Sequence, residues 1–302
     1  MSQQLNKNLQ DLNNKLTDEV SKLNINSFVD QLKNNIHLNG LIKSLKISDQ
    51  EILQNYVELY EYIQWCAEDK DSVFDRFVER NKHGKVVVVK KLAKNTKAKQ
   101  FMINNHLVAT EISAPITPLT LDEIPRNTLN QAKDVSFLTY KNYLLNVLEG
   151  QAQTPQLLNG MYMAGSADKR NFLLSTIANT FAYYTYQSAY INVSYLNEYW
   201  YSSIQDKTID MRGVVETLSE VQILVLDELC IKPLNSRFLE SVIYKILEYR
   251  ALNQKATFIG SYIEINKLTT TNLVEVKKSS DKFIAEKTIK IIHELCIGKD
   301  NS

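Results

Sequence analysis

Two acidic side chains end the most apolar run of the chain. The run ILVLDEL covers residues 223–229, and Asp227 and Glu228 follow its aliphatic residues. An aliphatic strand that ends in Asp-Glu is typical of a Walker B element, in which the aspartate orients Mg²⁺ and the glutamate orients the attacking water. The pattern is common by itself, so it needs a phosphate-binding segment upstream. With such a segment, Asp227 and Glu228 are the candidate catalytic pair.

The upstream segment MYMAGSADKRNFLLSTIANTF, residues 161–181, reads as a strand, a polar turn and a helix. A working phosphate-binding loop has the pattern G-x-x-x-x-G-K-[ST], whose backbone and lysine hold phosphates and whose hydroxyl holds Mg²⁺. In this chain Gly165 takes the first glycine position, Lys169 the last glycine, Arg170 the lysine and Asn171 the hydroxyl, and the loop is one residue short. The candidate nucleotide-binding residues are Gly165, Ser166, Lys169, Arg170 and Asn171.

These substitutions predict weak or lost use of ATP and Mg²⁺. Arginine does not act as the compact charge of lysine, and Asn171 lacks the hydroxyl that binds the metal. A non-glycine residue at position 169 would cost about 1 kcal/mol or more if the backbone needs a positive φ there. Two positive side chains at a helix N-terminus still favour an anion, which leaves weak nucleotide or phosphate binding open.

Strands and helices alternate from residue 134 onward. The segments MYMA, SAYINVSY, VQILVLDEL and ATFIGSY are predicted strands, and helices of ten or more residues separate them. This order indicates an α/β fold with a parallel sheet that helices cover on both faces. Ligands bind beyond the carboxyl ends of such strands. The fold therefore brings the two candidate segments to one edge of the sheet.

The rest of the chain divides into two regions. Residues 1–105 are predicted to form a mainly helical N-terminal domain, in which an S-x-x-E capping box begins at Ser48 and Val86–Val89 forms one strand of a small sheet. Residues 106–133 contain three prolines and are predicted to be a linker. The α/β domain then covers residues 134–302.

Composition excludes several classes of protein. The net charge is +1, so no global field attracts nucleic acid or anionic membrane. The three cysteines are far apart, and the sequence has neither a signal peptide nor a membrane-spanning run. We expect a cytoplasmic protein that does not contact the membrane. The lysine-rich run at Lys90–Lys99 is either a solvated surface or a weak contact with nucleic acid or an acidic partner.

The ordered series of motifs resembles the helicase loaders of the bacterial primosome, of the DnaI type. The resemblance lies in LYEYIQWCAEDKDS, NGMYMAGSADKRNFLLSTIANTF, SSIQDKTIDMRGVVETLSEVQILVLDEL and SRFLESVIYKILEYRALNQKATFIGSY. The residues that match the family's arginine-containing helix and following strand are Arg237, Leu247, Arg250, Thr257, Phe258 and Ser261. The resemblance implies an N-terminal domain that binds the replicative helicase. It also implies an AAA+ domain with the P-loop NTPase fold that binds ATP and single-stranded DNA.

The chain departs from the family at four places. Only Cys66 and His83 fall near the family's zinc ligands, and two ligands cannot hold a tetrahedral zinc ion, so no zinc or other metal site is expected. Tyr262 replaces the sensor-1 asparagine, and Lys287 and Ile291 stand where arginines belong. Together with the altered phosphate-binding segment, these changes indicate a relaxed demand for ATP turnover.

The sequence therefore predicts a helicase-loader-like factor in replication initiation that holds the replicative helicase without hydrolysing ATP. Its α/β domain would self-associate or touch single-stranded DNA. Two alternatives stay open. One is an active ATP-dependent loader or transposition-helper ATPase, which needs Arg170 or Lys169 at the γ-phosphate. The other is a single-stranded nucleic-acid-binding protein that uses Lys90–Lys99 and base stacking on the tyrosine-rich residues 183–203.

Overall fold

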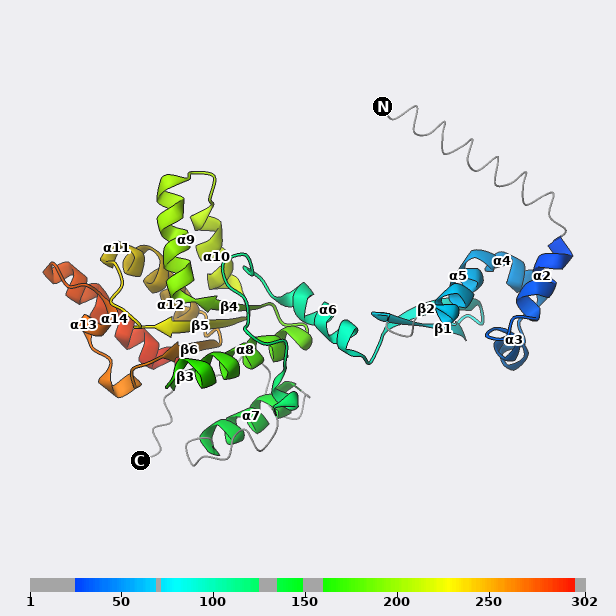
Figure 1. The fold of residues 1–302 in the computed structure, drawn as a ribbon, viewed down its shortest axis with the longest axis horizontal. Coiled ribbons are helices and arrows are strands. Elements are labelled where there is room, and N and C mark those ends of the chain that lie inside the picture. Colours follow the sequence, from blue (N-terminus) through cyan, green and yellow to red (C-terminus); the bar gives the residue numbers. More distant parts are fainter. Residues whose placement is uncertain (1–24, 69–71, 125–134, 149–159, 297–302) are drawn as a thin grey trace. The chain divides into compact units, whose positions relative to one another are not determined.

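The computed structural model describes residues 25–68, 72–124, 135–148 and 160–296, and for 25–28 and 135–140 it describes the backbone alone. The chain forms two compact units, Met1–Ala98 and Lys99–Ser302 (Figure 1). Each unit has a buried apolar core of its own. The part of the predicted N-terminal domain before residue 25 lies outside the described residues.

The first unit combines helices with a β-hairpin. Its elements are α2 (Ile25–Lys33), α3 (Asn39–Leu45), α4 (Asp49–Gln54), α5 (Tyr56–Ala67), β1 (Phe74–Arg80) and β2 (Val86–Leu92). The strands pair in antiparallel fashion, and Gly84 adopts a positive φ of 75° in the turn between them. The strand predicted at Val86–Val89 is confirmed, and it continues to Leu92.

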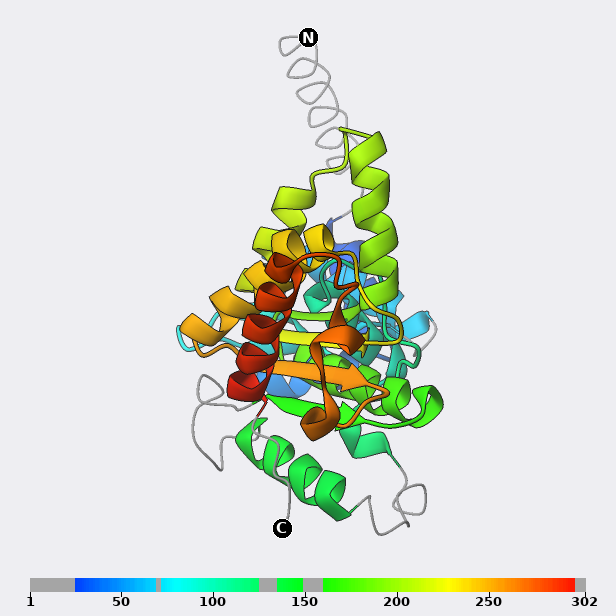
Figure 2. The same cartoon turned by 90° about the vertical axis from the view of Figure 1, so that its left-hand side faces the viewer.

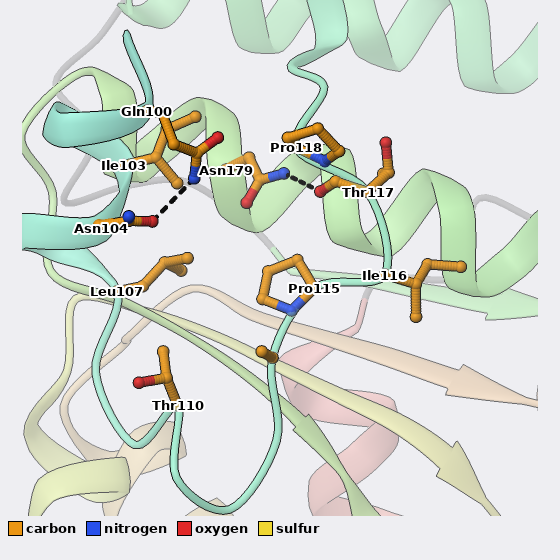
Figure 3. Close-up of a pocket in the computed structure, with 11 residues that line it drawn as sticks. Gln100, Ile103, Asn104, Leu107, Thr110, Pro115, Ile116, Thr117, Pro118 and Asn179 are labelled. Atoms are coloured by element: carbon orange, nitrogen blue, oxygen red, sulfur yellow. Dashed lines mark hydrogen bonds between the residues drawn. The ribbon is translucent and has the colours of Figure 1, made fainter. Parts of the chain in front are cut away.

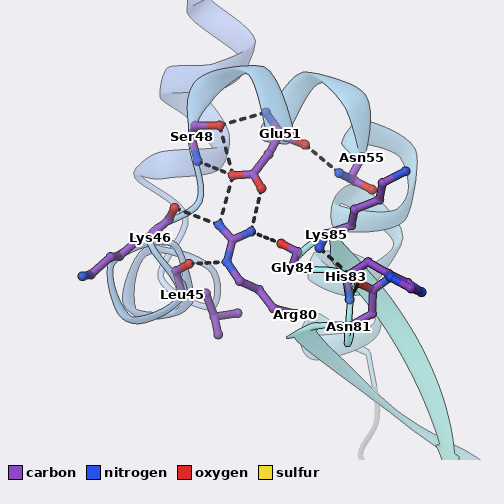
Figure 4. Close-up of polar contacts among 10 residues, drawn as sticks. All are labelled: Leu45, Lys46, Ser48, Glu51, Asn55, Arg80, Asn81, His83, Gly84 and Lys85. Atoms are coloured by element: carbon purple, nitrogen blue, oxygen red, sulfur yellow. Dashed lines mark hydrogen bonds and ion pairs between the residues drawn. The ribbon is translucent and has the colours of Figure 1, made fainter.

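An arginine on the hairpin ties this unit together (Figure 4). The predicted capping box is confirmed, because the Glu51 N–H donates to the Ser48 hydroxyl at 3.3 Å and the Ser48 N–H donates to the Glu51 carboxylate at 2.9 Å. The guanidinium of Arg80 donates to the same carboxylate at 2.7 Å and to the carbonyls of Leu45 and Lys46 at 2.8 and 2.9 Å. The bonds from Arg80 and the Ser48 backbone lower the pKa of Glu51 to about 2. Arg80 thus joins the end of α3 and the start of α4 to β1.

The second unit is built on a four-stranded parallel sheet. Its strands β3 (Met161–Ala164), β4 (Ser188–Asn192), β5 (Ile223–Leu229) and β6 (Thr257–Ser261) lie in the order β3-β6-β5-β4. Its helices are α7 (Val135–Leu148), α8 (Ala167–Tyr183), α9 (Val193–Gln205), α10 (Met211–Glu220), α11 (Ser236–Phe238), α12 (Lys245–Leu252), α13 (Thr270–Leu273) and α14 (Ser279–Leu295). Shorter turns are η1 (Leu121–Glu123), η5 (Leu239–Tyr244) and η6 (Ile265–Lys267). Helix α6 (Thr96–His106) begins in the first unit and continues into this one.

Helices cover both faces of this sheet (Figure 2). Along the central strand β5, Ile223 and Val225 lie in a core cluster with residues of α8, whereas Leu224 and Leu226 lie in a second cluster with residues of α9, α12 and α14. Successive side chains of a strand point to opposite faces, so an unbroken aliphatic run fits a strand that is buried on both sides. The predicted α/β fold with a helix-covered parallel sheet is confirmed.

The boundary between the units differs from the predicted one. It lies between Ala98 and Lys99, ahead of the expected linker at 106–133. The described part of that segment, 106–124, is packed into the second unit, where Ile112 joins one core cluster and Leu121 the other. Pro115 and Pro118 lie in irregular backbone of the α/β unit, so this described part is not a free connection.

Candidate functional site

The turn between β3 and α8 is much shorter than a phosphate-binding loop. Only Gly165 and Ser166 lie between the last residue of β3 and the first residue of α8, Ala167. Gly165 has a φ of 151°, and its N–H donates to the carbonyl of Ser261 at the end of β6 at 3.0 Å. Strand and helix are thus joined directly, and the backbone forms no wide loop that could surround a phosphate.

The other predicted nucleotide-binding residues lie in the first turn of α8. Lys169, Arg170 and Asn171 are all helical. The expectation that Lys169 would need a positive φ is therefore wrong, because α8 begins at Ala167 and the backbone at Lys169 is right-handed. Lys169 and Ser166 are exposed, whereas Arg170 is buried.

Arg170 and Asp227 form a buried ion pair. The Arg170 Nε lies 2.6 Å from the Asp227 Oδ1, and the two side chains are 1% and 0% exposed. The same guanidinium donates to the carbonyl of Gly165 at 2.6 Å and to the Oδ1 of Asn171 at 3.3 Å. The ring of Tyr262 lies 4.4 Å from its Cζ, within the range of a cation–π contact. The residue at the lysine position of the phosphate-binding pattern thus contacts the Walker B aspartate directly.

Both oxygens of Asp227 accept hydrogen bonds. The Oδ1 also accepts the N–H of Glu228 at 2.7 Å, and the Oδ2 accepts the hydroxyl of Tyr190 at 2.8 Å. Burial, followed by the charge of Asp227, raises the pKa of Tyr190, so this hydroxyl stays protonated and keeps donating. Buried polar groups need hydrogen-bond partners. The carboxylate of Asp227 finds all of its partners within the chain.

Gly260 on the neighbouring strand β6 leaves space for this pair. A Cβ atom at Gly260 would lie 2.2 Å from the Asp227 Oδ1, 2.5 Å from a methyl carbon of Leu174 and 3.0 Å from the Cδ of Arg170. Any larger residue would push the carboxylate or the arginine out of place. The glycine is therefore matched to the ion pair, and sequence reasoning missed it together with Tyr190. Gly260 stands near the carboxyl end of a predicted strand, which was the available signal, whereas Tyr190 stands in the middle of β4.

Glu228 departs from regular strand geometry. Its φ is 60°, in the left-handed region, and Cys230 has a φ of 64°. The pairing of β5 with β6 shifts register between Leu226 and Leu229. Among the described residues, the Glu228 carboxylate has no hydrogen-bond partner. Asp227 and Glu228 are thus neighbours with different surroundings, and only Asp227 contacts Arg170 in the first turn of α8.

These residues do not fit a magnesium–nucleotide complex. Mg²⁺ requires near-octahedral oxygen ligands, but both oxygens of Asp227 are engaged and a guanidinium lies against one of them. The side-chain oxygen of Asn171 accepts from the same guanidinium. The expected binding residues are therefore brought together, but they bind one another.

A metal site, a membrane-spanning helix and a reactive thiol are further features that would each indicate a function. In the described ranges, no three or more His, Cys, Asp or Glu side chains gather where they could hold a metal ion. Within those ranges, no helix is both long and apolar enough to span a membrane. Cys230 is buried, and burial raises the pKa of its thiol to about 12.

A polar face of α8 holds the segment that precedes it in the chain. The Ser175 hydroxyl accepts the N–H of Ile116 at 3.0 Å, and the Thr180 hydroxyl accepts the N–H of Leu121 at 2.8 Å. The Asn179 amide donates to the carbonyls of Thr117 and Leu119 at 2.6 and 2.9 Å. These side chains looked like ordinary polar positions of a helix in the sequence, yet they anchor residues 116–121.

A cavity of about 660 Å³ lies between this segment and α6 (Figure 3). Uncharged residues line it: Gln100, Ile103, Asn104, Leu107, Thr110, Ala114, Pro115, Ile116, Thr117, Pro118 and Asn179. At 1.5 Å per residue, Asn179 lies about 18 Å along α8 from its first residue. The cavity is thus separate from the strand ends that carry Asp227.

Arg250, which matches the family's helix, has a structural position. Its guanidinium is fully buried and donates to the carbonyls of Val221 and Ala256 at 2.6 and 2.5 Å and to the Thr257 hydroxyl at 2.9 Å. Burial lowers its pKa to about 9, which leaves it charged at neutral pH. Arg250 therefore fixes the entry into β5 and β6, whereas Arg237 is exposed.

The two segments that were candidates for nucleic-acid binding contain both buried or paired residues and exposed ones. Tyr190 is buried, but Tyr195 and Tyr201 on α9 are 55% and 45% exposed. In the lysine-rich run, Lys91 pairs with Glu79 at 3.1 Å in the first unit. Lys99 pairs with Glu123 in the second unit. The run is thus no single solvated patch, and the exposed tyrosines remain the clearer candidates for stacking.

Comparisons with known proteins find similar structures. No family model and no curated protein sequence matches the chain. A solved structure described as DnaI is 21% identical, with a TM-score of 0.49 over 64% of this chain and 95% of that one. A putative primosome component from Streptococcus pyogenes serotype M3 is 18% identical, with a TM-score of 0.43 over 66% and 93% of the two chains. The DnaC helicase loader is 18% identical, with a TM-score of 0.42 over 59% and 93%. Because the identities are low, these similarities concern the course of the backbone.

Proposed function

We propose that this protein is a helicase-loader-like factor of DNA replication initiation that binds the replicative helicase in the cytoplasm and does not hydrolyse ATP. The observation that carries the proposal is the contact between Arg170 and Asp227. It joins the two segments that resemble the Walker A and Walker B motifs of DnaI-type loaders, in the order and on the elements that the resemblance requires. It also places a guanidinium against the Oδ1 of Asp227, while the Oδ2 accepts the Tyr190 hydroxyl, so both oxygens are hydrogen-bonded within the chain.

The first unit offers a surface for the helicase. Leu53, Val57 and Tyr60 on α4 and α5 are 43%, 63% and 46% exposed. Val57 and Tyr60 stand three residues apart on α5, which is the spacing of one helix face, and Leu53 stands on the preceding helix α4. Exposed apolar side chains of this kind are typical of an interaction surface. The resemblance assigns helicase binding to the N-terminal region, and this apolar stripe of Leu53, Val57 and Tyr60 supports that assignment.

Co-elution of the full-length protein with the replicative helicase of its own organism, with mass determination and no nucleotide, tests the proposal. We expect a stable complex for the wild type. Val57→Glu should abolish it without unfolding the protein, because it places a charge in the apolar stripe. Ile36→Glu is the matched control, since Ile36 is 86% exposed outside the stripe, and it should leave the complex intact. If the wild type forms no complex, the helicase role is wrong; the same masses report self-association.

ATP turnover separates this proposal from an active loader. The wild type should turn over no ATP above the background of a blank preparation. Steady turnover that Asp227→Asn removes would establish the active ATPase, and it would require Arg170 to leave Asp227 during the reaction.

A second candidate function is binding of single-stranded DNA along α9. The exposed rings of Tyr195 and Tyr201 favour it, because bases stack on aromatic side chains with little sequence preference. Binding should weaken when both tyrosines are changed to alanine. Equal affinity of the double variant and the wild type at the same salt concentration would remove the role of these rings.

A further inference from the structure

The guanidinium of Arg170 makes the kind of contacts that a bound ligand would make, but it belongs to the chain itself. Its three guanidinium nitrogens reach three different acceptors, on Asp227, Gly165 and Asn171, and its flat face lies against Tyr262. A lysine could supply one point charge to one of these groups, whereas arginine presents several donors in a rigid plane. The change from the expected lysine to arginine therefore creates contacts that the ordinary pattern would not have.

The remaining surroundings fit this arrangement independently. Tyr190 from β4 donates to the second oxygen of Asp227, and Gly260 from β6 leaves the space that the carboxylate and the arginine occupy. The turn of Gly165 and Ser166 is too short to surround a phosphate. Residues from three strands and one helix thus converge on the ion pair, and none of them needs a bound ligand to complete its hydrogen bonds.

We propose that the guanidinium of Arg170 is a built-in substitute for the metal ion and nucleotide of this site, which locks β5 to α8 in one state and makes the protein insensitive to ATP. This inference deepens the proposed function, and it rests on that function only where it concerns the helicase. Nucleotide then has no differential interaction with two states of this chain, so it cannot switch the chain between them.

The side-chain N–H of Arg170 reports the lock directly. In full-length protein labelled with ¹⁵N-arginine, the Nε–H of Arg170 should exchange slowly with water, because it is buried and bonded to Asp227. Arg212 is the matched control in the same sample, since its Nε lies 2.8 Å from the Glu216 carboxylate while its side chain is 88% exposed. Its Nε–H should exchange fast. Arg170→Lys identifies the signal by its loss.

The test adds ATP and Mg²⁺ to this sample and to a thermal melt of the same protein. A ligand that binds only the folded state must raise the melting temperature. The proposal expects a protected Arg170 signal that does not move and a melting temperature that does not change at millimolar ATP. A signal that is unprotected, or that shifts with ATP and Mg²⁺ as the melting temperature rises, would overturn it. The helicase is absent from both measurements, so their outcome is independent of whether the partner is correct.

Discussion

Arg170 and Asp227 each depend on the other for their charge, because both are almost completely buried. A buried ion pair adds little net stability over an apolar pair, but removing one partner leaves an isolated charge in a medium of low dielectric constant. The contact is therefore a constraint on structure more than a source of stability. Its value to the protein lies in fixing which groups Asp227 contacts.

Single changes at this pair should cost more than the double change. Arg170→Met and Asp227→Asn should each lower the free energy of unfolding by about 3–5 kcal/mol, and the double variant should recover a large part of the combined loss. Urea unfolding followed by the fluorescence of Trp200 in the second unit measures this. Arg212→Met, which breaks an exposed pair, should cost about 0.3–0.5 kcal/mol. Additive effects of the two buried changes would show that the groups do not interact.

Gly260 should tolerate no side chain. Gly260→Ala puts a methyl group 2.2 Å from the Asp227 Oδ1, so the pair must shift, and the free energy of unfolding should fall by about 1–3 kcal/mol. Gly40→Ala is the control, because no atom lies within 4 Å of the position that its methyl group would take and α3 gains a better helix former. Equal stability of Gly260→Ala and the wild type, by the same urea assay, would mean that the pair is loosely held.

At the scale of elements, α8 carries Arg170 in its first turn and anchors residues 116–121 on its polar face. Only the first of these roles could be predicted from the sequence. Its N-terminal turn was identifiable, since a helix after an apolar strand and a Gly-containing turn is a familiar pattern. Lys169, Arg170 and Asn171 were aligned to the phosphate-binding pattern, but they lie in the first turn of α8, which begins at Ala167. Its polar face could not be interpreted at all, because the partners of Ser175, Asn179 and Thr180 are backbone groups far away in the chain.

Loss of one hydroxyl on this face should loosen the segment that α8 holds. Thr180→Val keeps the shape but leaves the buried Leu121 N–H without an acceptor, so the local opening free energy should fall by about 1–3 kcal/mol. Hydrogen exchange at the Leu121 amide measures it. Thr288→Val is the matched control, because Thr288 is also buried and donates to a carbonyl four residues back within its own helix. Unchanged exchange at Leu121 in Thr180→Val would contradict the anchoring role.

The first unit should lose stability in acid through Glu51. Its pKa is about 2 in the folded unit against an ordinary value of 4.5, so the stabilising contacts are fully present above about pH 4.5 and are lost as the pH falls towards 2. Glu51→Gln should be less stable at neutral pH and should lack this acid-dependent loss. Denaturation followed by Trp65 in a Trp200→Phe background isolates the first unit. The control is Glu58→Gln, an exposed carboxyl on α5, and a slope that it removes equally would contradict the role of Glu51.

Strand positions were the best predicted feature of the whole chain. Apolar runs located β3, β5 and β6 closely. The pattern is clearest for β5 and β6, which are buried on both faces, whereas β3 is a half-buried edge strand. The division into units was predicted less well, since prolines at 115 and 118 indicate irregular backbone but not which core covers it. The residues of the candidate site were predicted one by one. The bond between Arg170 and Asp227 could not be predicted, because it depends on the distance between helix α8 and strand β5.

In the whole molecule, the surface proposed for a partner and the Arg170–Asp227 pair belong to different units. The first unit carries the apolar stripe that we propose for the helicase, and the second unit carries the buried ion pair. Any response of the helicase itself to nucleotide must be removed from the comparison. A helicase variant that cannot bind nucleotide achieves this, and any remaining effect of ATP must then arise in this chain.

The affinity of this protein for that helicase variant, titrated without nucleotide, with ATP and Mg²⁺, and with ADP and Mg²⁺, tests the central claim most directly. We expect one dissociation constant in all three conditions and the same mass for the complex. A complex that forms only with ATP, or that ATP releases, would contradict the claim that Arg170 has made the site independent of nucleotide.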